Sequence, residues 1–247
     1  MNNEKLRDSE LGPDGQAAEV FNIDTTQFTG GDKEKVKIWD NFARRHLAEM
    51  RILKDAGLLG KKNTDWRNVS EHALVAGALA GILAKQLEAS GEDVNPELVE
   101  AAAILHDAGK RLDIENKVRY KAEGRKGVLP ELLKKAGYPE NFINMCRYTA
   151  RVPEIFLDEK DQDAAINKKS IGELLVAYCD ARIRNTEIVS LEDARDKNKE
   201  KVPKDADFYD KWYSFYKKLE ARIFEKTGQL KSEDFNNKKV ILNLLQK

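Results

Sequence analysis

The stretch AAAILHDAGK, residues 101–110, ends an apolar helical pattern with an adjacent histidine and aspartate. By helical spacing, His106 and Asp107 follow Ala103 by about one turn, so both side chains are expected to approach buried surroundings. A buried polar group needs a defined partner. An adjacent histidine and aspartate at the end of a helix can chelate one ion. Taken by itself, a buried histidine such as His106 is more often a hydrogen-bonded core residue than a metal ligand.

A second histidine and a distant aspartate strengthen the metal interpretation. His72 lies on the apolar stripe of a helix expected over residues 66–89. Asp180 lies far downstream in LLVAYCDARI, on a face shared with apolar residues. Burial of an unpaired carboxylate there would cost on the order of several kcal/mol, so an arginine or a metal ion must neutralise it. Glu173 and Glu187 share the Asp180 face and are rival acids.

The composition excludes several broad classes of protein. Lys plus Arg and Asp plus Glu both total 43 in 247 residues, so no net charge favours a nucleic-acid or anionic membrane surface. No apolar stretch approaches the roughly 20 residues that cross a bilayer, and the first residues show no secretory pattern. Cys146 and Cys179 lack CxxC spacing, which disfavours a disulfide scaffold. We expect a cytoplasmic protein.

Helical periodicity without convincing strands makes the expected fold class all-α. Residues 1–33 are interpreted as a flexible arm, residues 34–230 as the main helical domain, and residues 231–247 as a C-terminal helix packed on it. Asn95 as a cap and Pro96 as a first helical residue mark the clearest helix start. The expected helices cover residues 34–57, 66–89, 96–109, 130–136, 139–151, 168–185, 206–227 and 233–246, with a loop or frayed helix at 115–127.

Two further features are expected to serve packing. The third histidine, His46, has no partner motif and is interpreted as a surface or packing residue. The helix expected near 206–227 is rich in aromatic residues at core spacing, which favours packing over base stacking. Its apolar stripe could instead form the face of a homodimer. That stripe consists of Trp212, Phe215, Tyr216 and Leu219.

An isolated histidine, an HD pair that ends a helix and a distant helical aspartate together resemble the HD-domain superfamily. The chain looks like a mononuclear, HDxGK-type phosphohydrolase, and the likeness extends from the motif residues 72–180 to helical flanks over roughly 35–225. The resemblance implies an HD-type helical bundle, here with an N-terminal arm and extra C-terminal helices. It also implies four ligands for one divalent ion, namely His72, His106, Asp107 and Asp180.

The implied ligand set defines the expected chemistry. Two nitrogens and two carboxylates suit Mn, Fe, Co, Ni or Zn better than Mg. A water activated by the ion would attack a phosphomonoester or phosphodiester of a small phosphorylated metabolite, with a nucleotide the expected type. Asp107 is a candidate catalytic base for that water. The alternative is a non-catalytic HD protein that binds metal and ligand for regulation, whereas a purely structural adaptor would leave Asp180 unexplained.

Basic residues near the motif are candidates for substrate contact. Lys110 directly follows the helix end, and the resemblance implies that it acts on substrate. A cation that stabilises a helix C-terminus by about 0.3–1 kcal/mol explains it equally well. Arg147 and Arg184 are further candidates, although a salt bridge explains each at least as well. The same holds for Arg151 and Arg182, and the basic loop at 115–127 is more simply a solvated face.

Two branches of the superfamily do not fit the motif. Guanosine tetraphosphate hydrolases carry an acidic pair after HD. In this chain the HD pair is followed instead by Ala108, Gly109, Lys110 and Arg111. The binuclear branches need additional histidines before the last aspartate. None of the three histidines of the chain lies between Ala108 and Cys179. A mononuclear site is therefore expected.

Overall fold

A computed structural model of the chain describes residues 32–58, 67–116, 127–149, 152–184, 187–227 and 231–235. Across these residues the protein is almost entirely helical, which confirms the expected fold class. The N-terminal arm, Arg151 and the C-terminal helix expected near 233–246 fall wholly or mostly outside the described residues, as does most of the basic loop. Within the described part of the chain, no helix is long and apolar enough to cross a membrane.

The secondary structure consists of α-helices, short 3-10 turns and one small hairpin. The α-helices are α3 (Lys33–Arg45), α4 (Leu47–Asp55), α5 (Arg67–Ala89), α6 (Pro96–Leu105), α7 (Lys110–Glu115), α8 (Leu129–Lys135), α9 (Glu140–Arg147), α10 (Glu159–Asn167), α11 (Ile171–Arg182), α12 (Leu191–Lys201) and α13 (Ala206–Lys226). The 3-10 turns are η2 (Pro153–Phe156), η3 (Pro203–Asp205) and η4 (Ser232–Phe235). The hairpin pairs β1 (Ile183–Arg184) with β2 (Glu187–Ile188) in antiparallel register.

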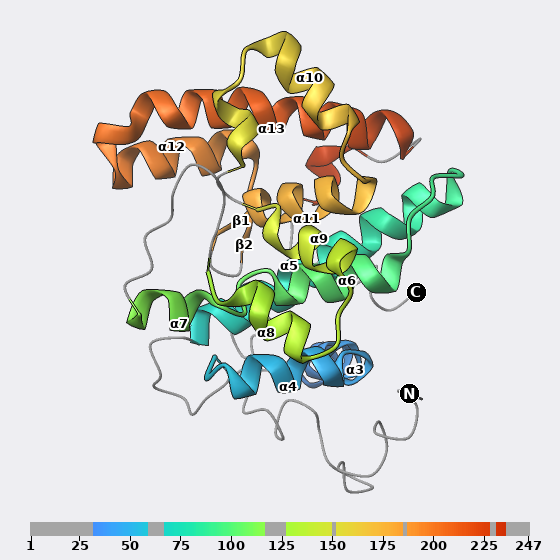
Figure 1. Ribbon diagram of the computed structural model, residues 1–247. Coiled ribbons are helices and arrows are strands. Elements are labelled where there is room, and N and C mark those ends of the chain that lie inside the picture. Colours follow the sequence, from blue (N-terminus) through green and yellow to red (C-terminus); the bar gives the residue numbers. More distant parts are fainter. Residues whose placement is uncertain are drawn as a thin grey trace, which may run out of the picture.

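Helices α5 and α6 form the centre of the molecule, and α11 packs on both (Figure 1). On one side, α3 and α4 lie against this centre through the contact of α4 with α6. On the other side, α12 and α13 run side by side and cover α11. The three central helices therefore meet where each of them can contribute a side chain to one site.

Two glycines allow α5 and α6 to approach closely. A Cβ atom added to Gly77 would lie 2.6 Å from Ile104 Cγ1, and one added to Gly81 would collide with the side chain of Glu100. Real side-chain carbons do not approach this closely, so a larger residue at either position would force Ile104, Glu100 or the helices to shift. The asparagine cap expected for α6 is confirmed, because Asn95 accepts a hydrogen bond from the Leu98 amide at 3.1 Å.

The long helix expected over 34–57 is interrupted at His46. The chain turns there, and α4 begins at Leu47. His46 has backbone angles of φ −116° and ψ 39°, which do not continue an α-helix. Its imidazole is buried and hydrogen-bonded to Glu100, so a tertiary contact accompanies the break in an otherwise continuous apolar pattern.

The expected helix 168–185 is too long at its C-terminal end. Helix α11 ends at Arg182, and the chain continues into the β1–β2 hairpin, which the sequence pattern does not predict. Ile183 has extended backbone angles, and the Val189 amide donates to the Arg182 carbonyl at 2.8 Å. The fully buried side chain of Arg182 also donates to the Val189 carbonyl. The backbone and the side chain of Arg182 therefore both bind Val189, the residue that follows β2.

Other boundaries also differ from the expected helices. Helix α6 ends at Leu105, and α9 ends at Arg147 instead of reaching residue 151. Helices α10 and α12 are not predicted from the sequence. Both are strongly polar, and α12 buries only Leu191 and Ala194, so too few apolar side chains recur to produce a clear period.

The aromatic stripe of α13 belongs to the core of the chain. Its four members are between 0% and 4% exposed, which confirms the packing interpretation. These side chains cannot also form the outer face of a homodimer, so that specific suggestion is wrong. A homodimer formed through another surface stays a prediction. The buried stripe comprises Trp212, Phe215, Tyr216 and Leu219.

Candidate metal centre

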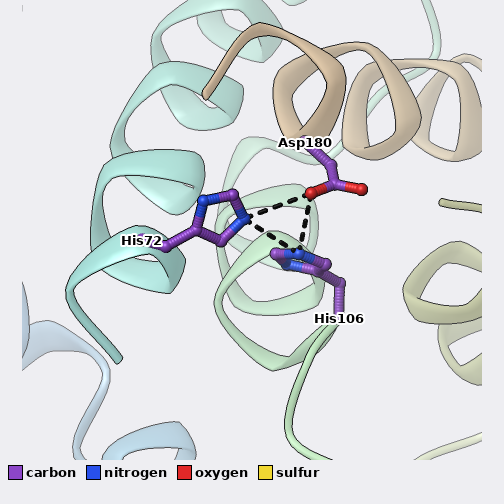
Figure 2. Close-up of side chains that lie close together, drawn as sticks. All are labelled: His72, His106 and Asp180. Atoms are coloured by element: carbon purple, nitrogen blue, oxygen red, sulfur yellow. Dashed lines mark hydrogen bonds and ion pairs between the residues drawn. The ribbon is translucent and has the colours of Figure 1, made fainter. Parts of the chain in front are cut away.

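The three central helices bring two histidines and one aspartate together. His72 comes from α5, His106 follows the last residue of α6, and Asp180 lies in the last turn of α11. Asp180 Oδ1 lies 3.1 Å from His72 Nε2 and 3.2 Å from His106 Nε2, and the two nitrogens are 3.3 Å apart. Figure 2 shows these atoms pointing toward one another. We refer to the three residues as the triangle.

The triangle is buried on one side and accessible on the other. The His106 side chain is 1% exposed, whereas those of His72 and Asp180 are 13% and 14% exposed. All three donor atoms lie within 4.8 Å of one another, which is a spacing that one metal ion can bridge. The triangle is therefore buried at His106 and reaches solvent at His72 and Asp180.

A backbone contact orients the imidazole of His106 for metal binding. Its Nδ1 lies 2.6 Å from the carbonyl oxygen of Ala103, and this oxygen can only accept a hydrogen bond. In the neutral ring, Nδ1 therefore carries the proton and Nε2 presents its lone pair toward Asp180. The same arrangement recurs at protein metal sites, where the second ring nitrogen of a histidine ligand donates to an outer partner. The donor chemistry of the triangle thus fits a divalent ion.

The charges of the triangle are mutually dependent. Burial would lower the pKa of His106, but the carboxylates of Asp107 and Asp180 outweigh it and raise this pKa above 6.5. Burial would raise the pKa of Asp180, but His106 and His72 hold it well below its ordinary value. Each group therefore favours the charged form of the other. A divalent cation bound by these atoms would compete with a proton on His106.

Asp107 lies at the edge of the triangle. Its Oδ2 is 3.7 Å from His106 Nε2 and accepts a hydrogen bond of 2.6 Å from Lys110 Nζ. The close three-residue group does not include Asp107. Its assignments as a fourth ligand and as a catalytic base therefore stay predictions, although it is a neighbour of the site.

Lys110 begins a helix and does not follow the end of one. Helix α6 ends at Leu105, and Gly109 precedes Lys110, the first residue of α7. A Cβ added to Gly109 would lie 3.0 Å from the amide nitrogen of Leu129, so glycine permits the tight approach of this turn to α8. Stabilisation of a helix C-terminus is therefore the wrong explanation for Lys110, whose ammonium contacts Asp107 instead.

The rival acids have other roles. Glu173 forms a capping box with Ser170 at the start of α11, with its Oε2 3.0 Å from the Ser170 amide. Glu187 lies on β2 and is exposed. Of the three acids on the shared face, only Asp180 reaches the two histidines.

The candidate arginines are distributed around the site and not gathered in it. Arg147 ends α9 and makes no side-chain ion pair or hydrogen bond within the described residues. Arg182 is fully buried and bonded within the core. Arg184 lies on β1, four residues after Asp180, and donates from Nη2 to the Ala194 carbonyl at 3.2 Å.

A second buried histidine cluster accompanies the metal centre. His46 Nε2 lies 2.8 Å from Glu100 Oε2, and its Nδ1 lies 3.5 Å from Glu49 Oε2. The Tyr138 hydroxyl donates to the other oxygen of Glu49 at 2.7 Å. His46 is 5% exposed, so of the two expectations for it, packing is right and surface exposure is wrong. Glu100, a carboxylate inside the apolar helix α6, was the sequence signal for this partner.

Comparisons with known proteins agree with this site. A family model described as HD domain matches residues 69–198, a range that contains the whole triangle. Ribonuclease Y of Enterococcus faecalis is 39% identical over 70 residues, which cover 28% of this chain and 12% of that protein. Ribonuclease Y of Desulfotalea psychrophila is 32% identical over 98 residues, which cover 40% of this chain and 17% of that protein. The matches thus span less than a fifth of either relative, and no solved structure matches significantly.

Proposed function

Because this chain belongs to the HD-domain family, we propose that it is a metal-dependent phosphohydrolase that acts on a phosphate ester of a small nucleotide-like metabolite. The observation that carries the proposal is the convergence of His72 Nε2, His106 Nε2 and Asp180 Oδ1 within 4.8 Å of one another. Three helices from distant parts of the sequence contribute these atoms. Two imidazole nitrogens and one carboxylate at such close range are costly without a cation.

In the proposed site the triangle holds one divalent ion, with Asp107 as the fourth ligand. The nitrogen and oxygen donors suit Mn, Fe, Co, Ni or Zn better than Mg. When bound, such an ion supplies Lewis acidity, which lowers the pKa of a coordinated water and neutralises charge on a phosphoryl group. The Ala103 carbonyl keeps His106 in the tautomer that this role requires.

In the proposed reaction Asp107 accepts a proton and Lys110 contacts the phosphate. Asp107 accepts a proton from the attacking water. The oxygen of this water bonds to phosphorus as the ester P–O bond breaks. The departing alcohol leaves with a proton from solvent. Lys110 lies 2.6 Å from Asp107 and is 38% exposed, so its ammonium can both orient that carboxylate and contact a phosphoryl oxygen.

The substrate class rests on two kinds of support. The partly accessible triangle suits a small phosphate ester, and the zero net charge of the chain offers no general attraction for a polyanion. The two relatives are named ribonucleases, which supports a ribonucleotide phosphodiester as one substrate to test. Nucleoside monophosphates are the phosphomonoester counterpart.

A substrate panel with Mn-loaded protein tests the proposal. Nucleoside 5′- and 3′-monophosphates, cyclic nucleotides, dinucleotides and short RNA are incubated with wild-type protein and with Asp107→Ala. We expect release of phosphate or nucleotide by the wild type and almost none by the variant. Metal content is measured for both. Metal and nucleotide binding without turnover would support the regulatory alternative, and equal activity of Asp107→Ala would reject the proposed base.

A further inference from the structure

Arg184 is a cation close enough to Asp180 for this carboxylate to act on its pKa. It lies on β1, four residues after Asp180, and β1 packs against α5, the helix that carries His72. Its Nη2 donates to the carbonyl oxygen of Ala194 in α12 at 3.2 Å. The guanidinium is thus bonded to α12, and the strand that carries Arg184 packs against α5.

The hydrogen-bonding capacity of this guanidinium is largely unused. Its Nε is buried without a hydrogen-bond partner, and the side chain forms no ion pair among the described residues. Arg182, only two residues earlier, instead donates to Ser232 and to other core groups. Buried N–H groups are nearly always paired because an unpaired one is costly. Arg184 therefore has donor capacity left for an acceptor outside the described residues.

The carboxylate of Asp180 forms no ion pair with the guanidinium of Arg184. Burial lowers the pKa of Arg184, while Asp180 and Tyr209 act in the opposite direction, so the side chain remains a cation. The Oδ1 of Asp180 already faces both His72 and His106. A divalent ion in the triangle would take up the negative charge of Asp180, and the guanidinium would then need another anion.

We propose that Arg184 is a phosphate-binding residue of the metal centre, whose planar donors contact non-bridging phosphoryl oxygens of the substrate. This inference rests on the proposed function, because the phosphate is the group whose ester bond would be hydrolysed. Arginine suits the role because its fork of N–H donors matches the oxygens of a phosphate. Arg184 and Lys110 then approach the phosphate from β1 and α7, two elements that follow Asp180 and His106 in the chain.

Inorganic phosphate binding to the full-length, Mn-loaded protein tests the inference by calorimetry. The variants are Arg184→Gln, Arg184→Lys and the control Arg195→Gln, whose side chain pairs with Glu192 and Asp196 on α12. We expect Arg184→Gln to weaken phosphate binding by about tenfold or more, with partial recovery in Arg184→Lys and no change in the control. Manganese affinity and melting temperature should stay close to wild type.

The outcomes separate this inference from the proposed function. Wild-type phosphate affinity in Arg184→Gln, or no phosphate binding by the wild type, would overturn it. A parallel loss of phosphate affinity, manganese affinity and stability would also overturn it, because Arg184 would then be only a brace to Ala194. Nucleoside monophosphates and dinucleotides serve as further ligands that distinguish a terminal from a bridging phosphate. If phosphate binding depends on Arg184 but no ester is hydrolysed, Arg184 is a phosphate-binding residue and the proposed phosphohydrolase activity is rejected.

Discussion

The Nδ1 atom of His106 lies 2.6 Å from the carbonyl oxygen of Ala103, a residue in the last turn of α6. This contact determines which nitrogen is free to bind a metal ion, because the carbonyl oxygen accepts only from a protonated Nδ1. The direction of Nε2 toward Asp180 is therefore set by the backbone of α6.

Replacement of His106 should abolish tight metal binding. His106→Gln removes one of the three converging donors, and we expect the affinity for Mn or Zn to fall by more than the roughly 10–100-fold typical for loss of an outer partner. Elemental analysis after dialysis and a fluorescent-indicator titration measure this loss. The matched control is His46→Gln, a buried histidine outside the triangle. Equal metal affinity in His106→Gln and the wild type would reject the site.

Removal of the Lys110 cation should impair turnover more than folding. Its hydrogen bond of 2.6 Å to Asp107 is charge-assisted, but Lys110 is 38% exposed, so the pair adds only about 0–1 kcal/mol to stability. We expect Lys110→Gln to lower kcat/KM by about 10–100-fold, with only a small change in melting temperature.

Steady-state kinetics on the best substrate of the panel measure the effect of Lys110→Gln. Lys134→Gln is the control, since that lysine is exposed and pairs with Glu140 at a distance from the triangle. An unchanged kcat/KM in Lys110→Gln would mean that the cation serves neither Asp107 nor the phosphate.

The contact between His46 and Glu100 should contribute strongly to stability. Glu100 is 3% exposed, and its Oε2 lies 2.8 Å from His46 Nε2. Loss of one partner of a buried ion pair costs about 3–5 kcal/mol when the other charge is left unpaired, but Arg45 and Lys85 still lie 3.8 Å from Glu100. His46→Gln should therefore lower the free energy of unfolding by an amount at the low end of this range, since glutamine keeps one donor.

Urea denaturation of wild type and His46→Gln measures the difference. Lys199→Gln serves as the control, because its pair with Asp210 is exposed and such pairs contribute about 0–1 kcal/mol. A loss below about 0.5 kcal/mol in His46→Gln, within the range of ordinary surface changes, would contradict a stabilising pair.

The same cluster should make stability depend on pH. Burial would lower the pKa of His46, but Glu100 and Glu49 outweigh it and raise the pKa above 6.5. This contribution is complete below 6.5 and is lost as pH rises through the raised value. Burial would raise the pKa of Glu49, but His46 and Tyr138 lower it below 4.5, so its contribution is present above 4.5 and is lost as pH falls through the lowered value.

The stability difference between wild type and His46→Gln should therefore be largest near pH 5–6 and shrink toward pH 9. Chemical denaturation at four or five pH values checks this sign. Arg45 and Lys85 also lie 3.8 Å from Glu100, but they are present in both wild type and His46→Gln, so they do not create the predicted slope in the difference. A difference that grows with rising pH would contradict the raised pKa of His46.

A methyl group at Gly81 should separate α5 from α6. The added Cβ would collide with the side chain of Glu100, and overpacking of a dense core costs about 1–3 kcal/mol. We expect Gly81→Ala to lower the melting temperature and to weaken metal binding, because His72 and His106 come from these two helices. Glu88→Ala, at an exposed position of α5, is the control. Unchanged stability of Gly81→Ala would show that Glu100 moves aside without cost.

Helical periodicity and motif order are local properties, so the sequence by itself determined them. The all-α class, the start of α6 at Pro96 and the nearness of His106 and Asp107 all follow from spacings within a few turns of one helix. The strongly polar helices α10 and α12 were not predicted, because they bury too few side chains to give a clear apolar period. The hairpin after Arg182 was not predicted, because the bonds that Arg182 makes to Val189 and Ser232 depend on the fold.

Only the tertiary structure decided which acid completes the triangle and what His46 does. Periodicity specifies the face of a helix but not what lies opposite that face, so helical spacing alone could not separate Asp180 from Glu173 and Glu187. The family resemblance favoured Asp180, and the packing of α11 against α5 and α6 brought this residue to the two histidines. The residues of the triangle are separated by up to 108 positions, and the partner of His46 lies 54 positions away. Contacts over such separations depend on how helices pack, because burial makes each polar group depend on whichever partner the packing supplies.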